Sequence, residues 1–324
     1  MDISVKDVYE ARARIRKYTR KTPLFYSHTL SSIYGAEVYL KLENFQVTGS
    51  FKVRGVFNKL LKHLDKYRHK VIITASMGNH AIALSYASRI LGLKSIIVVP
   101  SNITKIKKRR IENYGGEILI YGKDYDEAEH YARKLSEEKN YVYVSPYNDI
   151  DMIEGNATIS LEVIEENPNI DTLLVPVGGG GLISGISFLA KNFSNQIRVL
   201  GVQSEASPAM YESVKRGKIV KVNLYPSIAE GLHGNIEEDS ITFEFVKRFV
   251  DEILLVSEED IKIAIKTLYE LEGIIVEGAA AVTLAALKRY KEKFMNSHVC
   301  LVLSGGNIDP KHFIEVWSDN RLWL

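Results

Sequence analysis

The chain of 324 residues is long enough for one large or two smaller domains, and its 46% hydrophobic and 25% charged residues exclude disordered, collagen-like and coiled-coil proteins. A net charge of +2 gives no sign of a nucleic-acid or membrane partner, and a single cysteine excludes a disulfide framework. Because the sequence has no secretory signal and no run approaching the ~20 apolar residues of a membrane-spanning helix, we expect a cytoplasmic protein.

Short runs rich in Val, Ile and Leu recur along the chain and predict buried strands. In chain order they are 71–75, 95–99, 118–121, 141–144, 173–177, 199–203, 253–256 and 299–303. Longer amphipathic stretches between them predict helices, among them 80–91, 125–139, 182–192, 259–272 and 279–293. Such alternation is typical of parallel sheets covered by helices, so the predicted fold class is α/β.

These runs divide into two groups of four, before residue 146 and after residue 171, which predicts two lobes with a ligand cleft at the carboxyl ends of the strands. Residues 37–43 alternate in polarity and predict a further strand with one face in solvent, rather than a central strand. The basic run 105–110 has the spacing of a solvated helix face, and we favour that interpretation over a phosphate-binding patch.

The first of three glycine-containing turns, 75–80, reads Ala-Ser-Met-Gly-Asn-His and links a predicted strand to a predicted helix. Ser76 and Asn79 are residue types that cap helices, which is one interpretation of this turn. The other is that its backbone N–H groups and side chains bind a carboxylate. His80 has no visible partner for proton transfer, so we interpret it as structural.

The second turn, 176–182, gives the strongest local signal, with the sequence Pro-Val-Gly-Gly-Gly-Gly-Leu between a predicted strand and a predicted helix. Four glycines remove every Cβ, so backbone N–H groups and the positive end of the helix dipole can converge on an anion, which predicts a phosphate site. The sequence matches neither the dinucleotide fingerprint nor the P-loop. A tight turn that serves packing alone is the alternative.

The third turn, 304–307, reads Ser-Gly-Gly-Asn and follows the last predicted strand. In a doubly wound sheet the turns after several strands meet at one edge, so we expect the three turns to line one cleft. Because chance would seldom supply three such turns after three strands of one chain, the pattern predicts a single binding site.

Five motifs follow one another along the chain. They are Lys41-Leu42-Glu43-Asn44, Thr48-Gly49-Ser50-Phe51-Lys52 with Arg54-Gly55, Ser76 with Gly78-Asn79-His80-Ala81, Gly178-Gly179-Gly180-Gly181-Leu182, and Ser304-Gly305-Gly306-Asn307. In this order and spacing, which spans essentially the whole chain, they resemble the fold-type II pyridoxal-phosphate (PLP) enzymes, and within these the threonine/serine dehydratase (threonine ammonia-lyase) and serine racemase group. The resemblance implies two domains of open twisted sheets flanked by helices, as in the β subunit of tryptophan synthase. The large PLP-binding domain would comprise 1–69 and 149–324, and the small mobile domain 70–148.

The resemblance also implies roles for particular residues. Lys52 would form the Schiff base with PLP, a role that needs an amine of lowered pKa, and would then act as general base. Phe51 would pack near the cofactor ring, Asn79 would hydrogen-bond its phenolic oxygen, and Ser304 would face its pyridine nitrogen. The phosphate would be held by the backbone N–H groups of Gly178, Gly179, Gly180, Gly181 and Leu182.

The implied reaction is the β-elimination of water from L-threonine, L-serine or both, which gives 2-oxobutanoate or pyruvate and ammonia. Lys52 would remove the Cα proton, with Ser76 as the second catalytic residue. The small-molecule amino-acid substrate would be bound by Ser76, Met77, Gly78, Asn79 and His80. The preference between threonine and serine stays open, because one methyl group is worth only ~1–3 kcal/mol in an apolar pocket.

Met77 departs from the serine racemases that the chain resembles, in which a second serine at this position serves the opposite face of Cα. A thioether cannot carry a proton, so we do not expect efficient two-base racemisation. A racemase with elimination as a side activity is the alternative function. A non-enzymatic PLP-binding protein is disfavoured because Lys52, Ser76, Asn79 and Ser304 are retained together. A β-replacement enzyme is disfavoured by Lys52-Val53-Arg54-Gly55 in place of Lys-Asp-Arg.

The same relatives bind a divalent cation through acidic residues after the strand that corresponds to 199–203. In this chain Gln203 and Ala209 stand where carboxylates would be expected. Without two hard anionic ligands little remains to hold Mg²⁺ or Ca²⁺, although Glu205 is nearby. We therefore predict no metal site.

Three further segments bear on the cleft. Residues 229–231, Ala-Glu-Gly, resemble a family segment whose glycine lies near the cofactor ring, and Glu277 would be a supporting residue at the start of a helix rather than a catalyst. Residues 154–158 depart from the family pattern and leave the wall of the cleft undefined. The resemblance also implies a homo-oligomer, either a dimer or a tetramer.

Overall fold

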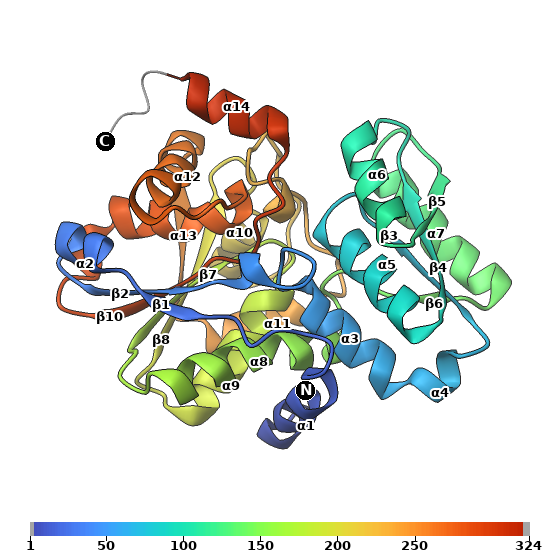
Figure 1. Ribbon diagram of the computed structural model, residues 1–324, viewed down its shortest axis with the longest axis horizontal. Helices are drawn as coiled ribbons and strands as arrows, with labels where there is room; N and C mark the ends of the chain where they lie inside the picture. The colour runs from blue at the N-terminus through green and yellow to red at the C-terminus, as the bar shows by residue number, and fades with distance from the viewer. Residues whose placement is uncertain (1–2, 320–324) are drawn as a thin grey trace.

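The computed structural model describes residues 3–319, which form two lobes that lie side by side (Figure 1). The larger lobe contains a six-stranded sheet with the strand order β1 (Leu24–Tyr26), β2 (Glu37–Lys41), β10 (His298–Val302), β7 (Thr172–Pro176), β8 (Arg198–Ser204) and β9 (Glu252–Val256). The smaller lobe contains a four-stranded sheet in the order β5 (Glu117–Ile120), β4 (Lys94–Val99), β3 (Val71–Ala75) and β6 (Val142–Tyr143). All neighbouring strands are parallel except β1 and β2. The predicted α/β class with two open sheets is confirmed.

Helices cover both faces of each sheet. In the larger lobe α12 (Glu258–Glu272) and α13 (Gly278–Arg289) pack on one face, and α8 (Ile150–Glu166) and α9 (Gly181–Phe193) on the other (Figure 1). In the smaller lobe α5 (Asn79–Leu91) and α7 (Tyr125–Lys139) take opposite faces. The other α-helices are α1 (Val5–Ile15), α2 (His28–Tyr34), α3 (Lys52–Lys62), α4 (Leu64–Tyr67), α6 (Lys105–Asn113), α10 (Ala209–Arg216), α11 (Ile241–Phe249) and α14 (Pro310–Ser318), and short 3-10 turns are η1 (Glu43–Phe45), η2 (Glu230–Leu232) and η3 (Lys291–Lys293).

The central strand of the larger sheet shows why its sequence reads as an unbroken apolar run. β7 is buried along its whole length between β10 and β8. Leu174 packs into the core beneath α12 and α13, while Leu173 and Val175 pack into the core beneath α8 and α9. A strand covered on both faces needs apolar residues at every position.

Among residues 3–319, no helix combines the length and apolar character needed to cross a membrane.

β2 is more buried than its alternating sequence predicts. It pairs with β1 on one side and β10 on the other, and its last residue, Lys41, is buried. The expectation that one face of this strand lies in solvent is therefore wrong at Lys41. The physical reason is an ion pair in which Lys41 Nζ lies 2.5 Å from a carboxylate oxygen of Glu162 in α8. A lysine in an alternating strand indicates solvent only when no buried partner is available.

Several elements lie outside the predicted runs, and β1 and α8 show why. β1 has only three residues, too few for a recognisable alternation. α8 is buried along almost all of its 17 residues, so its sequence lacks the polar stripe that marks an amphipathic helix.

Each predicted domain contains one sheet. The four strands of the smaller sheet fall between residues 71 and 143, and the six strands of the larger sheet fall outside that range. The domain limits at 1–69, 149–324 and 70–148, and the mobility of the small domain, stay predictions.

Candidate active site

Lys52 is the first residue of α3, where the loop after η1 enters the helix. Its Nζ donates a hydrogen bond of 2.7 Å to the carbonyl oxygen of Pro146 and lies 5.2 Å from the centroid of the Phe51 ring. Burial lowers the pKa of the Lys52 amine to about 8, and the carboxylate of Glu277 opposes this shift. Near neutral pH this amine is uncharged far more often than that of an exposed lysine, so it can act as a nucleophile or a base.

The turn between β7 and α9 presents backbone donors that no other described residue uses. Within residues 3–319, the N–H groups of Gly178, Gly179, Gly180, Gly181 and Leu182 donate no hydrogen bond. Gly180 has a φ of 91°, a left-handed conformation that favours glycine. These donors lie at the N-terminus of a helix of 13 residues, so the turn is suited to an anion such as a phosphate.

Tyr147, which the sequence analysis did not identify, lies against this turn. A Cβ at Gly179 would lie 2.5 Å from the Tyr147 ring, and one at Gly181 would lie 3.0 Å from the Tyr147 backbone. Tyr147 directly follows Pro146, whose carbonyl accepts the hydrogen bond from Lys52. One loop therefore connects the glycine turn to the lysine. A lone tyrosine in a loop gave no sequence signal for this position.

Residues 154–158 lie in the middle of α8 and are buried, so they support the site rather than form a wall of the cleft. Asn156 Nδ2 donates a hydrogen bond of 3.1 Å to the carbonyl oxygen of Gly181. A Cβ at Gly155 would lie 2.6 Å from the carbonyl oxygen of Arg54, which explains the glycine at this helix crossing. Residues 154–158 therefore contact both the glycine turn and α3.

The turn after β3 brings Asn79 to the same region. Asn79 Nδ2 donates a hydrogen bond of 2.6 Å to Glu277 Oε1, and its Oδ1 accepts one of 2.8 Å from Asn307 Nδ2. The interpretation of Ser76 and Asn79 as helix caps is wrong, because the N-cap of α5 is Gly78, without a side-chain cap. Instead, Ser76 Oγ accepts a hydrogen bond of 3.3 Å from the N–H of Gly78.

The first residues of the turn after β3 are accessible to solvent, whereas its last residue, His80, is buried. Ser76 and Met77 are partly exposed and Gly78 is exposed, so a ligand can reach them. His80 is buried, and its Nε2 lies 3.1 Å from the carbonyl oxygen of Val144. Burial lowers the pKa of His80 to about 3, and the charge of Lys52 adds to this shift. The imidazole is therefore neutral, in agreement with a structural role.

The third turn packs against the loop that carries Lys52. The carbonyl oxygen of Ser304 accepts a hydrogen bond of 3.0 Å from the N–H of Phe51, and Gly305 forms an isolated β-bridge with Ser50. Ser304 itself is buried. The third turn thus lies beside the lysine loop, as the convergence of the three turns predicts.

Glu277 lies at the N-cap of α13, where Gly305 makes room for its carboxylate and Gly231 lies within van der Waals distance. A Cβ at Gly305 would lie 2.5 Å from Glu277 Oε1, and one at Gly231 would lie 4.0 Å from the same oxygen. Burial raises the pKa of Glu277 to about 7, and the hydrogen bond from Asn79 opposes this shift. A Cβ at Gly178 would in turn lie 3.3 Å from the carbonyl oxygen of Gly231, so the 229–231 segment adjoins both the glycine turn and Glu277.

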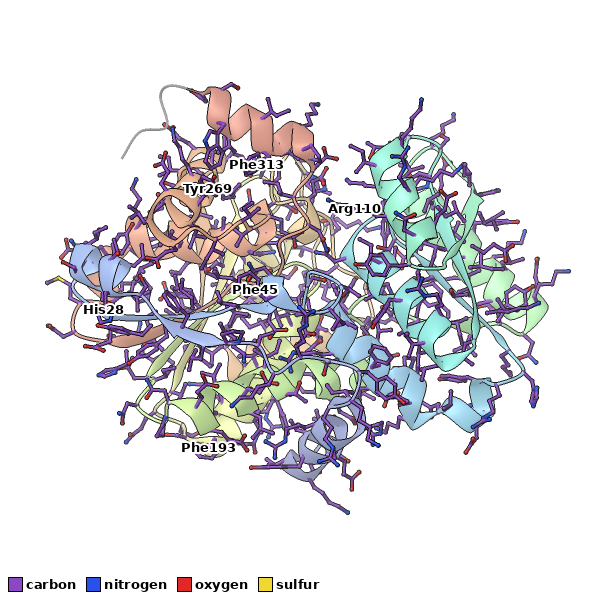
Figure 2. All side chains as sticks on the ribbon, viewed as in Figure 1. His28, Phe45, Arg110, Phe193, Tyr269 and Phe313 are labelled. Atoms are coloured by element: carbon purple, nitrogen blue, oxygen red, sulfur yellow. The ribbon has the colours of Figure 1, made fainter. Side chains whose placement is uncertain are left out.

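The basic run 105–110 is only partly a solvated face, and the interpretation is wrong for two of its residues. Lys107 Nζ lies 2.8 Å from a carboxylate oxygen of Glu230, and Arg110 Nη1 donates a hydrogen bond of 3.2 Å to the carbonyl oxygen of Asn307. Figure 2 shows Arg110 on the side of α6 that faces the larger lobe. These contacts span the two lobes, a pairing that the spacing of charges on one helix could not reveal.

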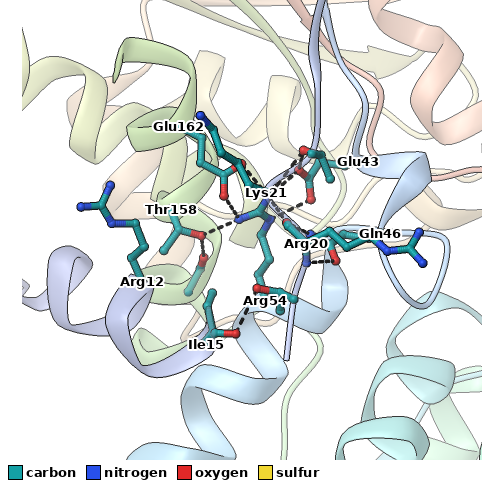
Figure 3. A network of polar contacts seen from close by, with 12 residues as sticks. Arg12, Ile15, Arg20, Lys21, Glu43, Gln46, Arg54, Thr158 and Glu162 are labelled. Carbon is teal, nitrogen blue, oxygen red and sulfur yellow. Dashed lines mark hydrogen bonds and ion pairs between the residues drawn. The ribbon is translucent and has the colours of Figure 1, made fainter. Parts of the chain in front are cut away.

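A buried network of charges lies beneath the start of α3 (Figure 3). Arg54, two residues after Lys52, donates to both carboxylate oxygens of Glu43 and of Glu162 at 2.7–2.9 Å. Burial opposes the charge of Arg54, but the two carboxylates outweigh this effect and raise the pKa of its guanidinium. Lys41 completes the network through Glu162. The network joins η1, α3 and α8 and so fixes the helix end that carries Lys52.

In the segment that corresponds to the cation site of the relatives, Gln203 and Glu205 have partners within the protein. Gln203 Oε1 accepts a hydrogen bond of 2.8 Å from the N–H of Tyr211, and Glu205 forms an ion pair of 2.7 Å with Arg289. Among residues 3–319, no group of three or more His, Cys, Asp or Glu side chains is arranged to bind a metal ion. The absence of a metal site in the protein stays a prediction.

Comparison with known proteins gives consistent matches along the chain. Residues 15–305 match the family model described as pyridoxal-phosphate dependent enzyme. An L-threonine ammonia-lyase of Thermotoga maritima is 40% identical over 309 residues, which cover 95% of this chain and 76% of the relative. A catabolic L-threonine dehydratase of Staphylococcus aureus is 39% identical over 311 residues, covering 95% and 90%.

Solved structures give the same result for the fold. Maize serine racemase superposes with a TM-score of 0.92 at 32% identity, covering 98% of this chain and 97% of that one. The processed isoform 2 of threonine deaminase from Solanum lycopersicum superposes with a TM-score of 0.90 at 30% identity, covering 99% and 94%. Both the lyase and the racemase branches of the predicted group therefore share this fold.

Proposed function

The chain belongs to the family of pyridoxal-phosphate dependent enzymes, and we propose that it is an ammonia-lyase that converts L-threonine, L-serine or both into 2-oxobutanoate or pyruvate and ammonia. The observation that carries the proposal is that one loop, Pro146 and Tyr147, contacts both Lys52, a lysine of lowered pKa, and the glycine turn with its unused backbone donors at residues 178–182. The names of the relatives from Thermotoga maritima and Staphylococcus aureus support this reaction over racemisation.

The residues of the site fit PLP. The N–H groups of residues 178–182 would hold its phosphate, Lys52 would hold the cofactor covalently, and Phe51 would pack beside its ring. One N–H of Asn79 is engaged by Glu277, which leaves the second for the phenolic oxygen, and the Ser304 hydroxyl would serve the pyridine nitrogen. Bound there, PLP supplies an electron sink for the charge that remains on Cα when its proton is removed.

Lys52 would carry out the proton transfer at Cα. Its amine has a pKa of about 8, so it can accept a proton without a large energetic cost and release it again at neutral pH. The carbonyl of Pro146 accepts a hydrogen bond from Nζ and so restricts the direction of the amine. The Phe51 ring lies 5.2 Å from Nζ, a distance at which the ring face favours the charged amine, so the lowered pKa of Lys52 comes from burial and not from this contact.

The substrate carboxylate would bind at the turn that begins α5. Ser76, Met77 and Gly78 are accessible there, and the N-terminus of a 13-residue helix favours a negative charge. Ser76 can donate its hydroxyl hydrogen to the carboxylate while its oxygen keeps the hydrogen bond from Gly78. Met77 offers no group that can carry a proton on the opposite side of Cα, which favours elimination over racemisation.

We expect PLP-loaded protein to form 2-oxobutanoate from L-threonine, and to form pyruvate from L-serine faster than it forms D-serine. The physical reason is that racemisation needs a second proton carrier, and the Met77 thioether cannot serve. A coupled assay for 2-oxo acids, with chiral chromatography of the remaining serine, measures both products. D-serine appearing faster than pyruvate would contradict the lyase assignment and favour the racemase.

Removal of divalent cations is expected to leave activity and stability unchanged. Gln203 and Glu205 already have protein partners, so no set of hard anionic ligands is left for a cation in this region. Dialysis against EDTA, followed by the 2-oxo acid assay and a thermal melt, tests this. A loss of activity that Mg²⁺ or Ca²⁺ restores would contradict the prediction.

We further propose that residues 70–148 form a small mobile domain that closes on the remainder, with Lys107 and Arg110 as its contacts at the edge of the cleft. Closure would exclude water from the reacting groups.

We also propose a homodimer or homotetramer in the cytoplasm, with no nucleic-acid or membrane partner. The near-neutral charge and the absence of a membrane-crossing helix among residues 3–319 support this placement.

A further inference from the structure

The Asn79 side chain makes two hydrogen bonds to residues of the larger lobe. Its Nδ2 donates to Glu277 Oε1 at 2.6 Å, and its Oδ1 accepts from Asn307 Nδ2 at 2.8 Å. Asn307 Nδ2 uses its other hydrogen for the carbonyl oxygen of Thr48, at 2.9 Å. Asn307 can therefore only donate on this side, and an ionised Glu277 can only accept.

This pattern fixes which way round the Asn79 amide lies. If the amide turned over, its NH₂ group would face the donor of Asn307 and that hydrogen bond would be lost, and while Glu277 is ionised the hydrogen bond to Glu277 would be lost as well. In the observed orientation one hydrogen of Asn79 Nδ2 is engaged and the other is left for a ligand. The two neighbours thus determine that Asn79 presents a donor and not an acceptor.

Two glycines show that this arrangement is built into the fold. A Cβ at Gly49, which has a φ of 74°, would lie 2.7 Å from Asn307 Oδ1, and a Cβ at Gly305 would lie 2.5 Å from Glu277 Oε1. Any larger residue would displace Asn307 or Glu277 from Asn79. The N–H of Gly306 also donates to the carbonyl oxygen of Gly49 at 2.9 Å, which holds the two loops together.

We propose that Asn307 and Glu277 are positioning residues that orient the Asn79 amide so that it donates a hydrogen bond to the phenolic oxygen of PLP. The arrangement joins α5 of the smaller lobe to two segments of the larger lobe, so the donor is correctly oriented only when the lobes are together. Arg110 reinforces the same junction through the carbonyl oxygen of Asn307. The inference rests on the proposed function, because it takes PLP as the ligand of Asn79.

The test compares N79A, N307D, the double variant N79A/N307D and the control N44D as PLP-loaded proteins. N307D keeps the shape of the side chain but replaces the donor by a carboxylate, which would attract the Asn79 NH₂ group and turn the amide over. Asn44 lies against Gly306, next to Asn307, and its Nδ2 donates to the carbonyl oxygen of Ile275 at 3.2 Å; among the described residues no hydrogen bond joins it to Asn79. N44D therefore makes the same chemical change beside the site and leaves Asn79 alone.

The readouts are the dissociation constant of PLP and the absorbance maximum of the bound cofactor, which responds to hydrogen bonds on its ring substituents. We expect N79A and N307D to weaken PLP binding by roughly threefold to tenfold and to shift the maximum in the same direction. Because Asn307 acts through Asn79, the double variant should bind within about twofold of N79A alone. N44D should match the unaltered protein in both readouts.

Three results would overturn the inference: a normal spectrum and affinity in N307D, effects of N79A and N307D that multiply in the double variant, or an equal shift in N44D. Failure of the unaltered protein to bind PLP would instead defeat the proposed function itself. The two failures are thus distinguishable in one titration series.

Discussion

The K52A variant is expected to lose at least about 10³-fold in the rate of 2-oxo acid formation and to show no absorbance from covalently held cofactor. Lys52 supplies both the attachment point and the base, and within the described residues no other lysine donates to Pro146 beside the glycine turn. Alanine also removes the only donor to that carbonyl among the described residues, but it leaves the packing of α3 intact. The variant should therefore fold and still bind free PLP through the turn.

K66A is the matched control for this experiment. Lys66 is exposed on α4 and makes no hydrogen bond or ion pair with any other described residue, so its removal should leave rate and spectrum unchanged. Absorbance spectra, 2-oxobutanoate assays and circular dichroism on the three proteins separate loss of chemistry from loss of fold. A coloured and active K52A protein would contradict the assignment of Lys52.

R54A is expected to lower the free energy of unfolding by about 3–5 kcal/mol. Arg54 is 1% exposed, and its removal would leave Glu43 and part of Glu162 buried without their main partner. An uncompensated buried charge costs more than a salt bridge contributes, so the loss should exceed that from removing an arginine of an exposed ion pair. Urea denaturation followed by fluorescence or circular dichroism measures this difference.

R68A provides the contrast. Arg68 pairs with Asp65 at 3.3 Å, but both side chains are largely exposed, at 62% and 98%. Such a surface pair contributes between about 0 and 1 kcal/mol, so R68A should unfold close to the unaltered protein. Equal losses in R54A and R68A would contradict a special role for the buried network.

The strand positions and the glycine turns were predictable because each follows from local chemistry. β7 and β10 are buried on both faces, so their apolar runs are unbroken, and the turn at 178–182 needs glycine at several consecutive positions. Lys52 was found through its motif and not through any physical property of the sequence around it. Its lowered pKa arises from burial, which exists only in the folded chain.

Contacts between distant segments were not predictable in the same way. The Tyr147 ring lies against Gly179, and Glu162 pairs with Lys41 and Arg54, yet none of these neighbours is close in sequence. Lys41 was expected to lie in a strand with a solvated face because alternation alone cannot reveal a carboxylate supplied by a helix more than a hundred residues away. Such pairings depend on how the helices pack, which patterns in a single sequence do not reveal.

Attachment of the cofactor to Lys52 can be tested directly. Reduction of PLP-loaded protein with sodium borohydride, followed by proteolysis and mass spectrometry, identifies the modified lysine directly. We expect one phosphopyridoxyl group per chain, on the peptide that contains Lys52, and none in K52A. Modification at a different lysine, or equal modification in K52A, would contradict it.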